Sequence, residues 1–165
     1  MRLFHYAIAT WWGSGLCPKA PGTAGSLATL PFVVLVLLFA PIEWLNQSFL
    51  GINLFFPLSI IIAILSYPGV KYVIVQEKDD DPAKVVIDEV VGQCMAFAFV
   101  SLNLLKNHPW LLLVGFAFFR FFDILKPLGI KRLEKIPGAV GVISDDLLGG
   151  IYAGLLLKTL LLFIF

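Results

Sequence analysis

Five long apolar stretches constrain this chain more than any other feature of its sequence. A helix that crosses a bilayer needs about 20 mostly apolar residues, because each residue advances roughly 1.5 Å through a hydrocarbon core about 30 Å thick. Each stretch reaches or approaches this length, and together they cover residues 23–40, 49–67, 88–105, 110–125 and 145–165. The sequence therefore predicts an all-α fold, a polytopic integral membrane helical bundle of about five spans, in a single domain over residues 1–165.

The overall composition supports this class and excludes others. Of the 165 residues, 59% are hydrophobic and 14% are charged, whereas about 25% of a typical soluble domain is charged. The formal net charge of +1 provides no broad basic field for nucleic acid, so we expect no nucleic-acid partner. Cys17 and Cys94 lie far apart without a metal-binding spacing, so we expect neither a disulfide nor a zinc site.

The first fifteen residues, MRLFHYAIATWWGSG, carry one arginine and a short apolar run that polar residues interrupt. This segment lacks the apolar core and cleavage site of a signal peptide. We expect it to lie in the membrane interface, with Trp11 and Trp12 at the depth of the lipid headgroups.

The connections between the stretches predict an orientation. If five helices cross the bilayer, nearly all basic residues of the connections lie on the same side as the N-terminus, and Lys106 alone lies on the other. The basic residues on the first side are Arg2, Lys19, Lys71, Lys78, Lys84, Lys126, Lys131, Arg132 and Lys135. Cytoplasmic loops carry an excess of Lys and Arg, so we expect a cytoplasmic N-terminus and a C-terminus on the opposite side.

Five acidic residues lie at the cytoplasmic ends of three predicted helices. Asp88 and Glu89 begin the third stretch, Asp123 lies near the end of the fourth, and Asp145 and Asp146 begin the fifth. Acids at a helix N-terminus suit the helix dipole, which alone could explain two of these positions but not Asp123. Charges within membrane segments are costly and commonly functional. Carboxylates without histidine or cysteine favour Mg²⁺, so we predict a magnesium site.

The fourth stretch also carries a polar stripe at a spacing of three residues, formed by Arg120, Asp123 and Lys126. One interpretation is a buried structural ion pair. In the other, Asp123 binds the metal while Arg120 and Lys126 bind phosphate oxygens. In the fifth stretch, Gly150 and Gly154 follow Asp146 on one helix face. Such a small-residue strip allows close approach of another helix, which would bring the acids together.

A glycine-rich segment precedes the first apolar stretch. Gly22, Thr23, Gly25 and Ser26 lie where this predicted helix begins. Backbone amides at a helix N-terminus, together with hydroxyl groups, can form a cradle for phosphate. The alternative interpretation is a glycine-rich turn with a Ser or Thr cap.

Four motifs in order resemble those of the phosphatidylglycerophosphatase A family. They are PGTAGS at 21–26, VVIDEVVG at 85–92, FRFFDILKP at 119–127 and PGAVGVISDDLLGG at 137–150. The resemblance covers nearly the whole chain. It implies a multi-pass enzyme of the bacterial inner membrane, with a cytoplasmic active site and a periplasmic C-terminus. It also implies Mg²⁺-dependent removal of the terminal phosphate from a phospholipid substrate, phosphatidylglycerophosphate, to give phosphatidylglycerol and phosphate.

Together, the motifs and the acid pattern predict the residues of the site. The metal ligands are drawn from Asp88, Glu89, Asp123, Asp145 and Asp146, and the catalytic residues are Asp88, Glu89, Asp123 and Asp146. The phosphate-binding residues are Arg120, Lys126, Gly22, Thr23, Gly25 and Ser26. Attack by water or through an aspartyl-phosphate intermediate, the number of metal ions and the range of accepted lipid phosphates stay open. An ion-coupled membrane transporter is the alternative function.

Overall fold

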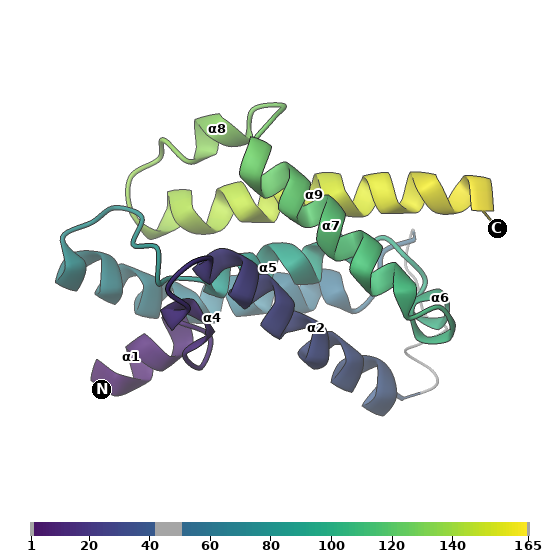
Figure 1. Cartoon of the computed structure of the whole chain (residues 1–165), viewed down its shortest axis with the longest axis horizontal. Helices are drawn as coiled ribbons and strands as arrows, with labels where there is room; N and C mark the ends of the chain where they lie inside the picture. Colours follow the sequence, from purple (N-terminus) through teal and green to yellow (C-terminus); the bar gives the residue numbers. More distant parts are fainter. Residues whose placement is uncertain (1, 42–50, 165) are drawn as a thin grey trace.

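A computed structural model describes residues 2–41 and 51–164 of the chain. Every regular element among them is helical (Figure 1). The elements are α1 (Arg2–Ala9), η1 (Ser14–Leu16), α2 (Pro21–Phe39), α4 (Phe55–Glu77), α5 (Ile87–Ala96), α6 (Leu102–Asn107), α7 (Trp110–Leu125), α8 (Ile130–Leu133) and α9 (Ala139–Ile164). The prediction of an all-α fold is confirmed for the described part of the chain.

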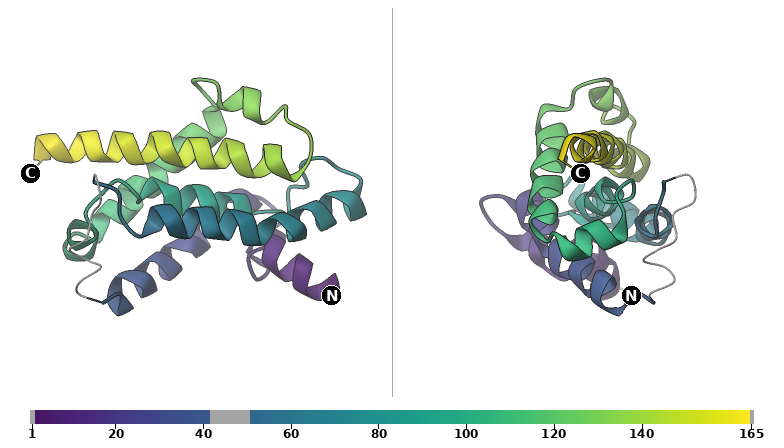
Figure 2. Two further views of the ribbon diagram at one scale, coloured as in Figure 1. Left: turned by 180° about the vertical axis from the view of Figure 1, so that it is seen from behind. Right: turned by 90° about the vertical axis from the view of Figure 1, so that its right-hand side faces the viewer.

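Within residues 2–41 and 51–164, three helices, α2, α4 and α9, are long and apolar enough to cross a membrane. They correspond to the first, second and fifth predicted stretches, although α4 continues to Glu77 and α9 starts earlier, at Ala139. Residues 49 and 50 of the second stretch lie outside the described residues. Figure 2 shows α4 and α9 lying along the long axis of the molecule. The count of five spans stays a prediction. Helix α7 has 16 residues, which gives a length of roughly 24 Å, and this is shorter than a hydrocarbon core of about 30 Å.

The prediction of one continuous helix over residues 88–105 is wrong. The chain forms α5 up to Ala96, turns over residues 97–101, and resumes as α6 at Leu102. Asn53 stabilises this break, because its amide donates hydrogen bonds to the carbonyl oxygens of Phe97 and Val100, at 2.8 and 2.5 Å. Irregular backbone in an apolar environment requires partners of this kind.

We expect Asn53→Ala to destabilise the protein. The substitution leaves the carbonyl groups of Phe97 and Val100 without these donors, and the Phe55 amide without the Asn53 oxygen that accepts its hydrogen bond at 2.7 Å. Each buried polar group without a partner costs about 1–3 kcal/mol, so the free energy of unfolding should fall by about 3 kcal/mol. Thermal unfolding in detergent, followed by circular dichroism, measures this. The control is Thr159→Ala, which removes an exposed hydroxyl of α9 and should leave the thermal midpoint unchanged. If Asn53→Ala were as stable as wild type, the role of Asn53 would be contradicted.

Helix α5 lies at the centre of the molecule and packs against α9, α4, α2 and α7 (Figure 1). Nine of its ten residues are buried, so its surroundings decide where its acids lie. A Cβ atom on Gly150 of α9 would collide with the carbonyl oxygen of Gly92 of α5, and one on Gly154 would press against the carbonyl of Ala96. The predicted close approach along the glycine strip is therefore confirmed. It places the N-terminal part of α9 directly against α5.

The N-terminal segment forms the short helix α1, which packs against α4. Several of its apolar side chains are exposed, among them Leu3 and Phe4. Trp11 packs edge-on against Phe32 of α2, whereas Trp12 is largely exposed. An exposed apolar surface of this kind is consistent with a membrane interface, and the depth of both tryptophans stays a prediction.

Candidate active site

The predicted polar residues converge on one pocket of about 310 Å³. Its lining comes from the start of α2, the loop before α5, the start of α5, the end of α7 and the first half of α9. The charged residues that line it are Asp81, Asp88, Glu89, Arg120, Asp123, Lys126, Asp145 and Asp146. No histidine or cysteine is among the described residues that line it. All five predicted acids thus face one pocket although they lie on three helices.

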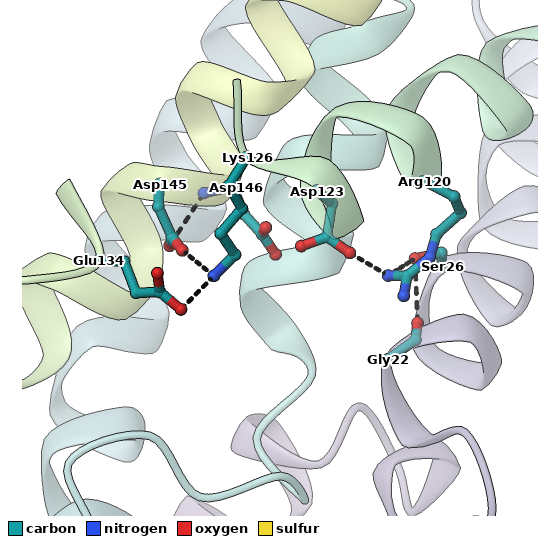
Figure 3. A network of polar contacts seen from close by, with 8 residues as sticks. All are labelled: Gly22, Ser26, Arg120, Asp123, Lys126, Glu134, Asp145 and Asp146. Atoms are coloured by element: carbon teal, nitrogen blue, oxygen red, sulfur yellow. Dashed lines mark hydrogen bonds and ion pairs between the residues drawn. The ribbon is translucent and has the colours of Figure 1, made fainter. Parts of the chain in front are cut away.

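Two basic side chains hold two of the five acids (Figure 3). The Arg120 guanidinium forms an ion pair with Asp123, Nη1 to Oδ2, at 2.6 Å. The Lys126 ammonium donates to Asp145 at 2.8 Å and to Glu134 at 2.9 Å. Burial alone would lower the pKa of Lys126, but these two hydrogen bonds raise its pKa above the ordinary lysine value. Lys126 therefore carries its positive charge throughout the neutral pH range.

The remaining acids form a tight group, and none of them forms an ion pair with a basic side chain among the described residues. Asp88, Glu89 and Asp146 each offer a carboxylate oxygen within 4.8 Å of the other two. Asp88 and Asp146 are buried, and neither Oδ1 of Asp88 nor Oε2 of Glu89 has a hydrogen-bond partner in the described part of the chain. At 4.8 Å two carboxylates repel each other by about 3 kcal/mol at an effective dielectric constant of about 20. A divalent cation with a preference for oxygen would remove this repulsion, so these residues fit a metal.

The structure also locates the glycine-rich segment. Gly22 and Thr23 line the pocket, at the first turn of α2. A Cβ atom on Gly22 would collide with the carboxylate of Glu89, so a larger residue there would displace this carboxylate from its present position. The amides in the first turn of a helix have no partner within that helix and can bind an anion.

Two predicted phosphate-binding residues do not line the pocket. Gly25 packs against Val86, where a Cβ atom would lie 2.7 Å from the Val86 Cβ. Ser26 is fully buried, its hydroxyl donates to the Gly22 carbonyl at 3.0 Å, and it accepts a hydrogen bond from Arg120 at 3.4 Å. Gly25 therefore serves helix packing, and Ser26 orients the arginine. Sequence spacing could not separate these roles from direct phosphate binding.

Two further acids of the site were absent from the predicted set. Asp81 lines the pocket from the loop before α5, and partial burial raises the pKa of its carboxyl, although Lys126 opposes this. Glu134, next to α8, is the second acceptor of Lys126. The Asp-Pro pair at 81 and 82 resembles one that often precedes the Asp-Glu motif in the phosphatidylglycerophosphatase A family, and this resemblance was a usable signal for the first residue. Nothing in the surrounding sequence distinguishes Glu134 from an ordinary exposed acid.

These observations define a helical, membrane-associated class of protein whose polar site suits a phosphate group beside a divalent cation. The model of the family described as Phosphatidylglycerophosphatase A matches residues 7–161. The chain therefore belongs to the phosphatidylglycerophosphatase A family and is a lipid phosphatase. The prediction of the family is confirmed.

Curated relatives agree with this assignment. The chain is 34% identical to a Haemophilus influenzae protein over 90% of its own length and 83% of the relative's, and 31% identical to an Escherichia coli protein over 92% and 80%. Both of these proteins are named phosphatidylglycerophosphatase A. A Bacteroides thetaiotaomicron protein, 35% identical over 91% of this chain and 89% of its own, carries a provisional phosphatidylinositol-3-phosphatase name. No solved structure matches the chain.

Proposed function

We propose that this enzyme hydrolyses the terminal phosphate of phosphatidylglycerophosphate to give phosphatidylglycerol and inorganic phosphate, with Mg²⁺ as cofactor. The observation that carries the proposal is the division of charge in the pocket. Two basic side chains, Arg120 and Lys126, lie beside three carboxylates that have no basic partner among the described residues. This arrangement provides separate places for a phosphate group and for a cation.

The residues divide into two roles in this proposal, binding the cation and binding the phosphate group. Asp88, Glu89 and Asp146 hold the cation, with Asp123 and Asp145 beside them. When bound, Mg²⁺ supplies positive charge for the phosphate oxygens and acidifies a coordinated water. Arg120 and Lys126, helped by Thr23 and the first amides of α2, neutralise the remaining phosphate charge as the ester bond lengthens.

The reaction follows from this placement. A water oxygen forms a new bond to phosphorus while the bond from phosphorus to the glycerol oxygen breaks. The glycerol oxygen leaves with the electron pair of the broken bond and takes a proton from solvent water. A pocket carboxylate accepts the proton of the attacking water and later returns it to solvent. Positioning and charge stabilisation carry most of such phosphoryl transfers. Direct attack by a carboxylate is the alternative, and it would leave phosphate on the enzyme for a measurable time.

The membrane arrangement is part of the proposal. The enzyme is a single domain in the bacterial inner membrane, its N-terminus and pocket face the cytoplasm, and its C-terminus lies in the periplasm. The excess of basic residues on the N-terminal side supports this orientation. Five crossings require that α7 spans the bilayer by itself. They also require that the short helices α5 and α6 together form one further crossing. The lipid tails then stay in the bilayer while the headgroup enters the pocket.

Phosphate release from phosphatidylglycerophosphate in detergent micelles tests the proposal. We expect EDTA to abolish release and added Mg²⁺ to restore it, because the carboxylate group then regains its counter-charge. Ca²⁺ at the same concentration should restore little, since it is larger and takes more ligands than Mg²⁺. Full activity in excess chelator would refute the role of the metal.

The choice of substrate has a second candidate. The name of the Bacteroides thetaiotaomicron relative points to phosphatidylinositol 3-phosphate as a competing phospholipid monoester. The same assay with phosphatidylinositol 3-phosphate and with phosphatidic acid measures the preference. A higher kcat/KM for either lipid than for phosphatidylglycerophosphate would reassign the substrate while leaving the phosphatase chemistry intact.

A further inference from the structure

The side chain of Gln93 is fully buried in α5, and neither atom of its amide has a hydrogen-bond partner in the described part of the chain. A buried amide without partners costs several kcal/mol relative to its state in water. An apolar side chain of similar size would avoid this cost. The glutamine therefore needs a reason that packing does not supply.

Gln93 follows Glu89 by four residues in the same helix. This spacing puts the two side chains on one helix face, with Cβ atoms about 5–6 Å apart. Oε2 of Glu89 is one of the few other buried polar atoms without a partner among the described residues. The amide group of Gln93 is a donor and this carboxylate oxygen is an acceptor, so the two are chemically matched.

Arg120 supplies the complementary atom. Its Nε is also buried without a partner in the described part of the chain. The Arg120 guanidinium and the Glu89 carboxylate both border Gly22: Nη1 of Arg120 lies 3.3 Å from the position of a Cβ atom there, which would also meet Glu89. Helices α5 and α7 pack against each other. Apart from Oδ1 of Asp88 in the metal group, the buried side-chain atoms without a partner in the described part of the chain are two donors, Arg120 Nε and Gln93 Nε2, and two acceptors, Gln93 Oε1 and Glu89 Oε2.

We propose that Gln93 is a positioning residue that links the phosphate-binding arginine to the metal-binding carboxylate. In the cation-loaded site its carbonyl oxygen accepts from Nε of Arg120, and its amide donates to Oε2 of Glu89. The link leaves Oε1 of Glu89, the oxygen next to Gly22, free to bind the cation. Side chains that orient metal ligands in this way typically change metal affinity by 10–100-fold when they are removed.

This proposal rests on the proposed function, and direct metal binding tests it without substrate. The probe is Mn²⁺, titrated by calorimetry into the purified full-length protein in detergent. We expect Gln93→Met, which has a similar volume and no amide, to weaken Mn²⁺ binding about tenfold or more. Its thermal midpoint without metal should be equal to or above that of wild type, because an unsatisfied amide has been removed.

The matched control is Ser59→Ala. The buried hydroxyl of Ser59, in α4, donates to the carbonyl of Val91 at 2.7 Å, and Val91 belongs to α5, the helix that carries Gln93. This substitution should lower stability and leave Mn²⁺ affinity unchanged. If Gln93→Met does not fold, Gln93→Asn keeps the amide but withdraws it by one methylene, and we expect the same weakening. Mn²⁺ affinity within twofold of wild type in the folded variant would overturn the role of Gln93 alone. Failure of the wild-type protein to bind Mn²⁺ would overturn the metal site of the proposed function as well.

Discussion

Asp146→Asn is expected to reduce phosphate release by about a thousandfold while the protein stays folded. Asp146 is buried, belongs to the group of three carboxylates without a basic partner in the described residues, and lies beside Asp123 in Figure 3. Loss of one ligand should cost several kcal/mol of transition-state stabilisation, and about 4 kcal/mol corresponds to a factor of roughly 10³ in rate. Phosphate release under saturating Mg²⁺ measures the effect.

The same substitution should raise the thermal midpoint of the metal-free protein. Asparagine replaces one of three carboxyl groups that lie within 4.8 Å of one another, so the metal-free protein no longer bears the cost of placing a charge at this buried position. Gain of stability with loss of function is typical of substitutions at active sites. Asp80→Asn, which removes a charge outside the pocket, should change neither quantity. A folded Asp146→Asn protein with a rate within tenfold of wild type would exclude Asp146 from the catalytic site.

Arg120→Lys is expected to lower kcat/KM by about a hundredfold, despite keeping the positive charge. The guanidinium contacts Asp123 and Ser26 at once, and its planar group of donors can bind two phosphate oxygens together. The lysine ammonium is a point charge on a flexible chain and cannot reproduce this geometry. Removal of one positioned donor at a developing negative charge typically costs 10²–10³-fold.

Steady-state kinetics with phosphatidylglycerophosphate test the arginine. Arg132→Lys, an exposed position in α8, is the matched control and should retain the wild-type kcat/KM. Arg120→Ala should lose more activity and also stability, because Asp123 is then largely buried without its counter-charge. Equal kcat/KM for Arg120→Lys and wild type would mean that the Arg120–Asp123 pair is structural, which is the alternative interpretation of the stripe.

Several structural features could not be read from periodicity. The stretch 88–105 is apolar along its whole length, yet it breaks after Ala96 because Asn53, more than forty residues earlier, satisfies the carbonyl groups of the turn. Ser26 and Gly25 lie in a segment that suits phosphate binding. Their burial against Arg120 and Val86 assigns them to positioning and packing. In each case the deciding partner is distant in sequence.

The sequence alone determined that this chain is helical and apolar enough for a membrane, and which side chains could bind a cation or a phosphate. Hydropathy and residue type are local properties that add up along a chain, so they can be read without coordinates. The tertiary structure decided how the charges are divided: which acids are neutralised by Arg120 and Lys126, and which three face one another without a basic partner among the described residues. That division depends on contacts at Gly92 and Gly150, where the backbones of α5 and α9 approach closely, and at Gly22, which leaves room for the Glu89 carboxylate. The spacing of small residues predicts a close helix contact, but it does not indicate which helix makes that contact or which charged groups the contact brings together.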